Sequence, residues 1–208
     1  MPRASERVAA EAPRARRADA RRNVEAILDA AVACLTRDPD VSVAEIATAA
    51  GVGRVTLYGH FKTRADLVDA TLVRTIERAD QILDTTDTSG DPVEALTRLV
   101  ASSWQIVDQF RNVLLAAQRE LPAERIRGVH DHVQRRIESV VERGQRDGAF
   151  RTDLPRRWMV TTVISLMHAA AEDAAAGRVK VDQVPGLITA TLLAAFTAPG
   201  ATVRPLPG

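Results

Sequence analysis

The 208-residue sequence predicts an all-α protein, and three observations support this fold class. Alanine is abundant, whereas aromatic residues make up 3% of the chain. Apolar residues recur at three- and four-residue spacing over long stretches, which is typical of amphipathic helices. No stretch sustains the period-two alternation of β-branched residues that half-buried strands show. With 46% hydrophobic and 26% charged residues, the chain has the composition of an average globular protein.

Helices are expected, in chain order, over about 22–37, 43–50, 54–60, 63–84, 91–119, 122–144, 155–176 and 183–197. The first ends at Asp38-Pro39-Asp40, because proline cannot continue a helix. Asp91 and Pro92 supply an N-cap and a first-turn proline for the fifth. The last two helices carry apolar residues around much of their circumference, which is typical of helices covered on more than one side. A second copy of the chain is the expected cover, with packing inside one monomer as the alternative.

Charge distribution and cysteine content bear on the possible partners of the protein and on its compartment. The net charge of +1 is no argument for a nucleic-acid partner, but residues 1–22 hold seven arginines against three acidic residues. A flexible basic arm of this kind can reach a phosphate backbone or a minor groove, and a solvated tail is the alternative. The single cysteine, Cys34, cannot form an internal disulfide and is expected in the core. Because the sequence has neither a secretory signal nor a membrane-spanning run, we expect a cytoplasmic protein.

Residues 42–67 contain the most informative pattern. Ser42 and Glu45 have the spacing of a capping box, and Thr63 and Asp66 repeat it with the shorter acid before the fourth helix. Four apolar residues have the spacing to form a small core beneath a bent helix pair: Ile46, Val52, Leu57 and Phe61. Gly51 is expected to form the turn, since a tight link between steeply crossed helices often needs positive φ.

The second short helix, residues 54–60, is too polar to be explained by burial. Its side chains are mostly polar or small, so we expect them to face outward. A short exposed helix on a rigid base suits insertion into a major groove about 12 Å wide. One alternative is a helical ligand-binding or enzymatic protein in which the helix pair is only structural, and salt-dependent duplex binding separates the two. Another is a module for protein contacts alone, which leaves the arginine arm unexplained.

The pattern resembles the TetR family of transcriptional repressors, which typically has an Ala-x-x-Ala-Gly-Val turn followed by Leu-Tyr-x-His-Phe and a basic residue. The matching positions are Ala47, Ala50, Gly51, Val52, Leu57, Tyr58, His60, Phe61 and Lys62. Gly59 departs from many relatives, which have a larger side chain there. The detailed match covers about residues 23–68, and beyond it the likeness is only architectural.

The resemblance implies a homodimeric, ligand-responsive repressor that binds a palindromic operator in double-stranded DNA and is released by a small, hydrophobic effector. The release is implied to follow from movement of the fourth helix. Base contacts are implied for Arg54, Val55 and Thr56. Backbone contacts are implied for Tyr58, His60, Lys62 and Thr63, and Ser42 is counted with the DNA-binding residues.

The effector pocket is expected among the later helices. Large or adaptable side chains with a few polar groups are typical of apolar pockets. The candidates chosen on this basis are Trp104, Phe110, Trp158, Met159, Met167 and His168. Ordinary core packing is the alternative for each of them.

Catalytic and metal-binding patterns are not found. His130 and His132 are spaced so that they lie on different sides of a helix, which argues against a metal site. There is no Gly-rich phosphate loop, Ser-His-Asp order or paired-carboxylate pattern. We therefore expect neither enzymatic activity nor a cofactor. His168 and Glu172, four residues apart, are expected to pair at a dimer interface or to anchor an effector.

The expected domain organisation follows from these segments. The turn-rich stretch 85–91 has no apolar residue and is the expected boundary between the two main domains. The predicted parts are a flexible basic arm (1–22), a helix-turn-helix DNA-binding domain (23–68), a connecting part of the fourth helix (69–84), a helical effector-binding and dimerisation domain (91–198) and a tail (199–208).

Overall fold

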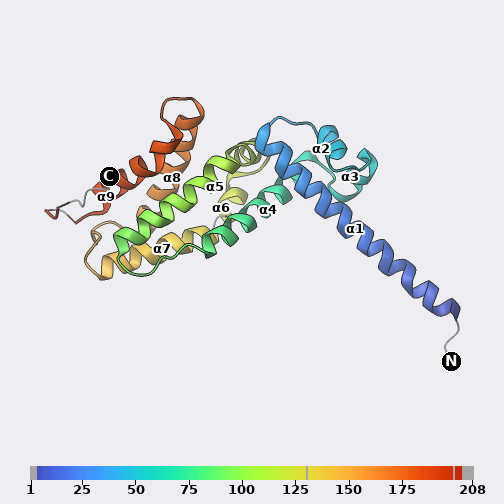
Figure 1. Ribbon diagram of the computed structural model, residues 1–208, viewed down its shortest axis with the longest axis horizontal. Coiled ribbons are helices and arrows are strands. Elements are labelled where there is room, and N and C mark those ends of the chain that lie inside the picture. Colours follow the sequence, from blue (N-terminus) through green and yellow to red (C-terminus); the bar gives the residue numbers. More distant parts are fainter. Residues whose placement is uncertain (1–3, 130, 199, 203–208) are drawn as a thin grey trace. The chain divides into compact units, whose positions relative to one another are not determined.

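The computed structural model describes residues 4–129, 131–198 and 200–202, and for residues 4–17, 131 and 132 it describes the backbone alone. Within this part of the chain every regular element is a helix, which confirms the predicted fold class (Figure 1). In chain order the elements are α1 (Ala4–Arg37), α2 (Val43–Ala49), α3 (Arg54–His60), α4 (Arg64–Asp84), α5 (Pro92–Glu120), α6 (Ala123–Val129), α7 (Asp131–Arg146), α8 (Arg156–Ala175), the 3₁₀ helix η1 (Val181–Gln183) and α9 (Val184–Phe196).

The chain forms two compact units, and α4 and α5 each contribute to both. Unit 1 comprises Met1–Thr75 and Asn112–Pro122, and unit 2 comprises Ile76–Arg111 and Ala123–Gly208. The division therefore falls within the two long helices and not in the loop 85–91, where the sequence predicted it.

The loop 85–91 belongs to unit 2 because two arginines hold its backbone. Arg98 donates hydrogen bonds of 2.7 and 2.8 Å to two carbonyls of the loop. Arg143 of α7 donates to a third, the carbonyl of Thr88. At the end of the loop Asp91 caps α5 as predicted, since its Oδ1 accepts from two first-turn amides at 2.9 and 3.1 Å.

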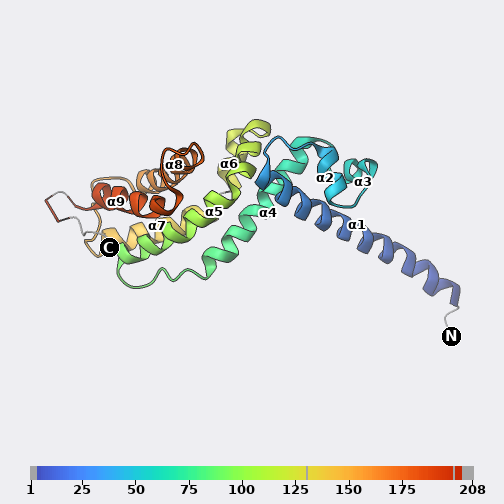
Figure 2. The same ribbon diagram turned by 45° about the horizontal axis from the view of Figure 1, so that its top comes forward.

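The first helix starts much earlier than the sequence pattern predicted. α1 begins at Ala4 and not near Arg22, so the segment expected to be a flexible arm is helical. Alanine, arginine and glutamate dominate this segment, and all three are strong helix formers. The N-terminal half of α1 extends beyond α2 and α3 (Figure 2). Side chains before residue 18 lie outside the described part, so their contact with DNA stays a prediction.

Unit 1 has a core to which each of its first four helices contributes. The fully buried side chains include Ile27, Leu35, Ile46, Leu57, Leu67 and Leu72. Cys34 is also buried and free, as predicted. α4 buries two threonines, Thr71 and Thr75, whose hydroxyls donate to backbone carbonyls one turn earlier at 2.7 and 2.8 Å. These bonds satisfy both polar groups inside the apolar core.

Unit 2 is a bundle in which α7 packs on α8 and α8 packs on α9. The rings of Phe150 and Phe196 meet edge to face, with centroids 6.0 Å apart, in the core near the end of α7. The amide of Arg151 donates to the carbonyl of Phe196 at 2.7 Å and joins this region to the end of α9. The single helix predicted over 122–144 is divided into α6 and α7, and His130 between them lies outside the described residues.

None of the helices in the described residues combines the length and the apolar character that crossing a membrane requires.

Candidate functional site

The start of α2 is fixed by the predicted capping box. The Ser42 hydroxyl oxygen accepts from the amide of Glu45 at 3.2 Å, and the Ser42 amide donates to the Glu45 carboxylate at 2.9 Å. The Ser42 hydroxyl also donates to this carboxylate at 2.6 Å, and these hydrogen bonds lower the pKa of Glu45 below its usual value. The one hydroxyl hydrogen of Ser42 is therefore already donated to Glu45 within the cap. A hydrogen bond donated from this hydroxyl to a phosphate would require that bond to be given up.

The start of α4 has the second predicted cap. The Thr63 amide donates to the Asp66 carboxylate at 2.9 Å, and the Asp66 amide donates to the Thr63 hydroxyl oxygen at 3.0 Å. Between the two caps Gly51 has a φ of 67°, as the turn between α2 and α3 was predicted to require. The sequence prediction for the local geometry of this segment is therefore confirmed.

A small core holds α3 against α2. Leu57 is completely buried, Ile46 is 1% exposed and Phe61 is 9% exposed, while Val52 is half-buried. Ala47 is also buried, and its small side chain permits the close approach of the two helices. Within α3 itself Leu57 is the buried residue, so the rest of this helix is free to face outward.

The exposed face of α3 and the short segment after it carry most of the residues predicted to contact DNA. The side chain of Val55 is 88% exposed and that of Tyr58 is 46% exposed. Arg54, Lys62 and Thr63 are exposed as well, and Thr56 and His60 are half-buried.

The charge of this face is positive. No acidic residue occurs between Val52 and Ala65. Arg54 and Lys62 make no hydrogen bond or ion pair with any residue that the structure describes. A rigid, exposed helix with two available cations can dock against an anionic polymer and present short side chains to a groove.

Arg64, the first residue of α4, holds the segment between α1 and α2 in place. The sequence pattern does not reveal this role. The Arg64 guanidinium donates to the carbonyls of Val41 and Pro39, the latter at 2.9 Å, and to the carboxylate of Glu120 at 3.0 Å. The side-chain amide of Asn112 donates to the carbonyl of Thr36 at 2.9 Å. The end of α5 is therefore fastened to the segment between α1 and α2.

Sequence alone offered no signal for these contacts, because the partners lie far apart along the chain. The Arg64–Glu120 pair, for example, spans 56 positions. Glu120 and Asn112 belong to α5, and the part of this helix that precedes Asn112 belongs to unit 2. A segment predicted to serve the effector domain thus supplies structural contacts to the DNA-binding domain.

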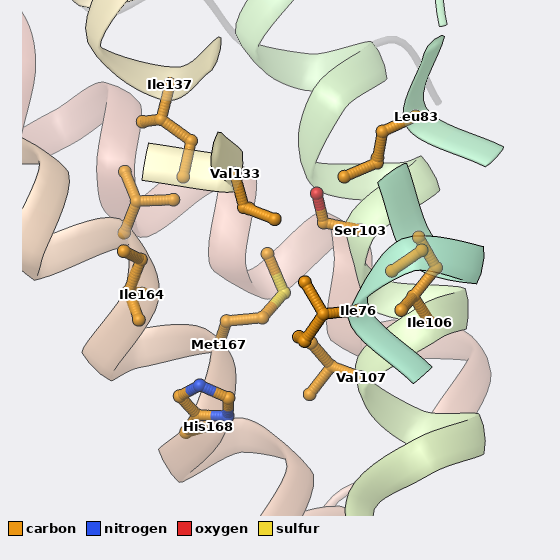
Figure 3. A pocket seen from close by; sticks show the side chains of 12 residues that line it. Ile76, Leu83, Ser103, Ile106, Val107, Val133, Ile137, Ile164, Met167 and His168 are labelled. Atoms are coloured by element: carbon orange, nitrogen blue, oxygen red, sulfur yellow. The ribbon is translucent and has the colours of Figure 1, made fainter. Parts of the chain in front are cut away.

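Unit 2 contains a cavity of about 80 Å³ between α4, α5, α7 and α8 (Figure 3). Its lining residues are Ile76, Ala79, Leu83, Ser103, Ile106, Val107, Val133, Ile137, Val163, Ile164, Met167 and His168. Of the six predicted pocket residues, Met167 and His168 line it. Trp104, Phe110 and Met159 are buried elsewhere in unit 2, and Trp158 is 62% exposed.

Most of the lining could not be recognised from sequence, because small aliphatic residues on amphipathic helices look the same whether they pack against a core or border a cavity. Ser103 is the exception. A hydroxyl among apolar residues in the middle of α5 is a sequence signal that can indicate a cavity with a polar group in its wall. Among the described residues no group of three or more His, Cys, Asp or Glu side chains is placed to hold a metal ion.

These features define a class of protein: a helix-turn-helix protein that carries a second helical unit with an apolar cavity. The model of the bacterial regulatory proteins of the tetR family matches residues 27–71, which lie in unit 1. The chain is 27% identical over 183 residues to the HTH-type transcriptional repressor LfrR of Mycolicibacterium smegmatis, covering 86% of this chain and 93% of LfrR. The chain is therefore similar to TetR-family transcriptional regulators in its helix-turn-helix segment and to one such repressor over most of its length.

Solved structures are similar to this chain as well. The structure of LfrR from Mycobacterium smegmatis in complex with proflavine is similar with a TM-score of 0.65 and 26% identity, over 88% of this chain and 99% of that one. The fatty acid degradation regulator FadR from Bacillus halodurans shares the fold, with a TM-score of 0.70 and 21% identity over 87% of this chain and 97% of its own. Both likenesses extend across unit 1 and unit 2.

Proposed function

We propose that the protein is a homodimeric repressor that reads a palindromic operator with α3 and leaves the operator when an apolar small molecule occupies the cavity of unit 2. The observation that carries this proposal is the outward face of α3, with its exposed side chains and two available cations on a buried base. A helix pair that served only to pack would not leave Val55 and Tyr58 in solvent. The alternative of a purely structural helix pair is therefore not favoured.

In the proposed complex α3 enters the major groove. Arg54 at its first turn donates to O6 and N7 of a guanine, and Val55 contacts a thymine methyl group, with Thr56 beside them. Tyr58, His60, Lys62 and Thr63 contact phosphates and fix the register. The amides at the start of α4 add a site for a phosphate, because the N-terminus of a long helix attracts anions.

The second copy of the chain is proposed to cover the last two long helices. Large apolar side chains remain exposed there: Trp158 in α8 is 62% exposed and Leu187 in α9 is 52% exposed. Ala190 and Ala194 are also exposed, and their small side chains allow another helix to approach α9 closely. A two-fold dimer through these helices presents two copies of α3 to two half-sites, which is why the operator is expected to be palindromic.

Release is proposed to proceed through α4. This helix lines the cavity with Ile76, Ala79 and Leu83, and the same continuous helix carries Arg64 and Arg74 in unit 1. Arg74 pairs with Glu25 and Asp29 of α1 at 2.6 and 2.9 Å. A ligand that favours a shifted α4 lowers affinity for DNA, since only differential affinity for two states moves the equilibrium between them. The complex of the relative LfrR with proflavine supports small-molecule control.

The test is selection of bound duplexes from a random pool with the purified full chain, followed by light scattering of the protein alone and on the selected duplex. We expect a palindromic consensus, a dimer in solution and an affinity that falls steeply with salt. A chain that selects no sequence, or a monomer whose mass on DNA corresponds to one copy per duplex, would contradict the proposal. A bacterial repressor of this kind acts in the cytoplasm, beside the chromosome.

A further inference from the structure

The wall of the cavity in unit 2 is almost entirely apolar. Ten of its twelve lining residues are apolar, and the other two are Ser103 and His168. No Asp, Glu, Lys or Arg contributes to the lining. In Figure 3 Ser103, on α5, and His168, on α8, lie on opposite sides of the Met167 side chain. The polar side chains of the lining are thus one hydroxyl and one imidazole within an otherwise apolar wall.

Charged side chains of the surrounding helices lie outside the lining of the cavity. Asp84 of α4 pairs with Arg136 of α7, and Asp80 lies 4.0 Å from the same guanidinium. Arg127 and Arg157 line a different hollow, of about 480 Å³, which shares only Ile164 with the cavity. An ion buried in the cavity would therefore lose its hydration without gaining a pairing partner from Asp, Glu, Lys or Arg, which is strongly unfavourable.

We propose that this cavity selects uncharged, mainly apolar ligands whose polar groups are satisfied by Ser103 and His168, and that it discriminates against organic cations and anions of the same shape. This inference rests on the proposed function, because it names the class of effector that acts at the same site. The hydroxyl of Ser103 and the imidazole of His168 each offer hydrogen bonds to a neutral oxygen or nitrogen group. The apolar wall accounts for the rest of the affinity.

Met167 sets the capacity of the cavity. Sites for small molecules usually enclose roughly 300 to 1,000 Å³, several times the present volume. Met167 lies in the middle of the lining, with Val133 and Ile164 on one side and Ile76 and Val107 on the other (Figure 3). Its side chain is 4% exposed and unbranched, so it can adopt another rotamer and yield space where a branched residue could not. A ligand occupies the volume that this side chain leaves.

The test measures charge preference in the full chain without DNA. N-phenyl-1-naphthylamine, a neutral dye that fluoresces in apolar sites, is bound first and then displaced by 1-decanol, decylammonium or decanoate. These three probes share one hydrocarbon chain and differ in charge. We expect 1-decanol to displace the dye at a concentration at least tenfold lower than either ion. Met167→Ala is expected to raise the affinity for the dye several-fold, because it empties the middle of the cavity.

A matched pair of variants locates the effect in the cavity. Ser103→Asp places a carboxylate on the wall and is expected to lower the concentration of decylammonium needed by at least tenfold. Ser103→Asn, which is similar in shape and neutral, is expected to leave the order of the probes unchanged. Circular dichroism checks that both variants fold. Should Ser103→Asp not fold, the series on the unmodified chain still decides the question.

Three results would overturn the inference: no binding of the dye, displacement by either ion at the same concentration as 1-decanol, or an unchanged response of Ser103→Asp to decylammonium when that variant folds. If decanoate is preferred and Arg157→Gln abolishes the preference, the larger hollow holds an anionic head group and the inference also fails. Duplex selection reports on the proposed function separately. A chain with the expected charge preference but no selected DNA would contradict that function and not the ligand class.

Discussion

Replacing Gly144 by alanine is expected to lower the free energy of unfolding of unit 2 by about 2 to 3 kcal/mol, the cost of overpacking a close-packed core. A Cβ at this position of α7 would lie 2.8 Å from Cγ of Phe150 and still closer to two other ring atoms. The ring cannot move aside cheaply, because Phe150 is 1% exposed and packs edge to face on Phe196. Its backbone is also fixed, since the Phe150 amide donates to the carbonyl of Gly144 at 2.9 Å.

Urea unfolding followed by tryptophan fluorescence measures this effect, because both tryptophans, Trp104 and Trp158, lie in unit 2. Gly128→Ala is the matched control: a Cβ there meets nothing within 4 Å, so stability should stay the same or rise by up to about 1 kcal/mol. In a Phe150→Leu background the cost of Gly144→Ala should shrink, since the two sites are in contact. An equal cost in both backgrounds would show that the ring is not the obstacle.

Replacing Arg64 by methionine is expected to lower the stability of unit 1 by about 2 to 3 kcal/mol, because several charge-assisted hydrogen bonds are removed together. Methionine keeps an apolar stem over the same surface but cannot donate. The carbonyls of Val41 and Pro39 and the carboxylate of Glu120 lose their shared donor. Since Val41 directly precedes the Ser42 cap, the start of α2 should loosen as well, and DNA affinity should fall.

Glu120→Gln separates the ion pair from the backbone contacts. The Arg64–Glu120 pair is partly open to solvent, with 26% and 30% of the two side chains exposed, so losing the charge alone should cost at most about 1 kcal/mol. Far-UV circular dichroism during thermal unfolding follows both variants. If Glu120→Gln proved as damaging as Arg64→Met, the ion pair and not the backbone contacts would hold this segment. An unchanged transition for Arg64→Met would contradict any stabilising role for this side chain.

The parts of the protein that could be predicted from sequence are those determined by neighbours along the chain. The caps at Ser42 and Thr63 depend on side chains three residues apart, and the turn at Gly51 depends on one residue that tolerates positive φ. The small core under α3 follows from helical spacing alone. The same spacing predicts which side chains of α3 face outward.

The parts that could not be predicted depend on contacts between distant segments. Asn112 and Glu120 stabilise unit 1 from the end of α5, and neither has a local pattern that reveals its partner. The division between the two units within α4 and α5 also has no local sequence signal. The helical pattern of apolar residues is the same before and after the point of division. In α1 the prediction of a flexible arm from the basic composition of residues 1–22 is wrong, because the alanine, arginine and glutamate of this segment favour a helix.

The proposed docking of α3 predicts two separable effects in DNA binding. Arg54→Ala should relax base preference at one position of each half-site, because a bidentate arginine contributes roughly 1 to 3 kcal/mol of discrimination for guanine. Lys62→Ala should weaken binding to all sequences alike, because a phosphate contact carries no sequence information. In a dimer the slope of log affinity against log salt should drop by about 0.9 for each of the two phosphates that a lysine no longer neutralises.

The most direct test of this account is therefore one binding series, in which the wild type, Arg54→Ala and Lys62→Ala are titrated against the selected operator and its single-base variants at several salt concentrations. We expect Arg54→Ala to change the ranking of the base variants at symmetric positions, and Lys62→Ala to change the salt slope while the ranking stays the same. If Arg54→Ala leaves the ranking unchanged while Lys62→Ala alters it, α3 does not read the major groove in the orientation proposed, even if the protein binds DNA.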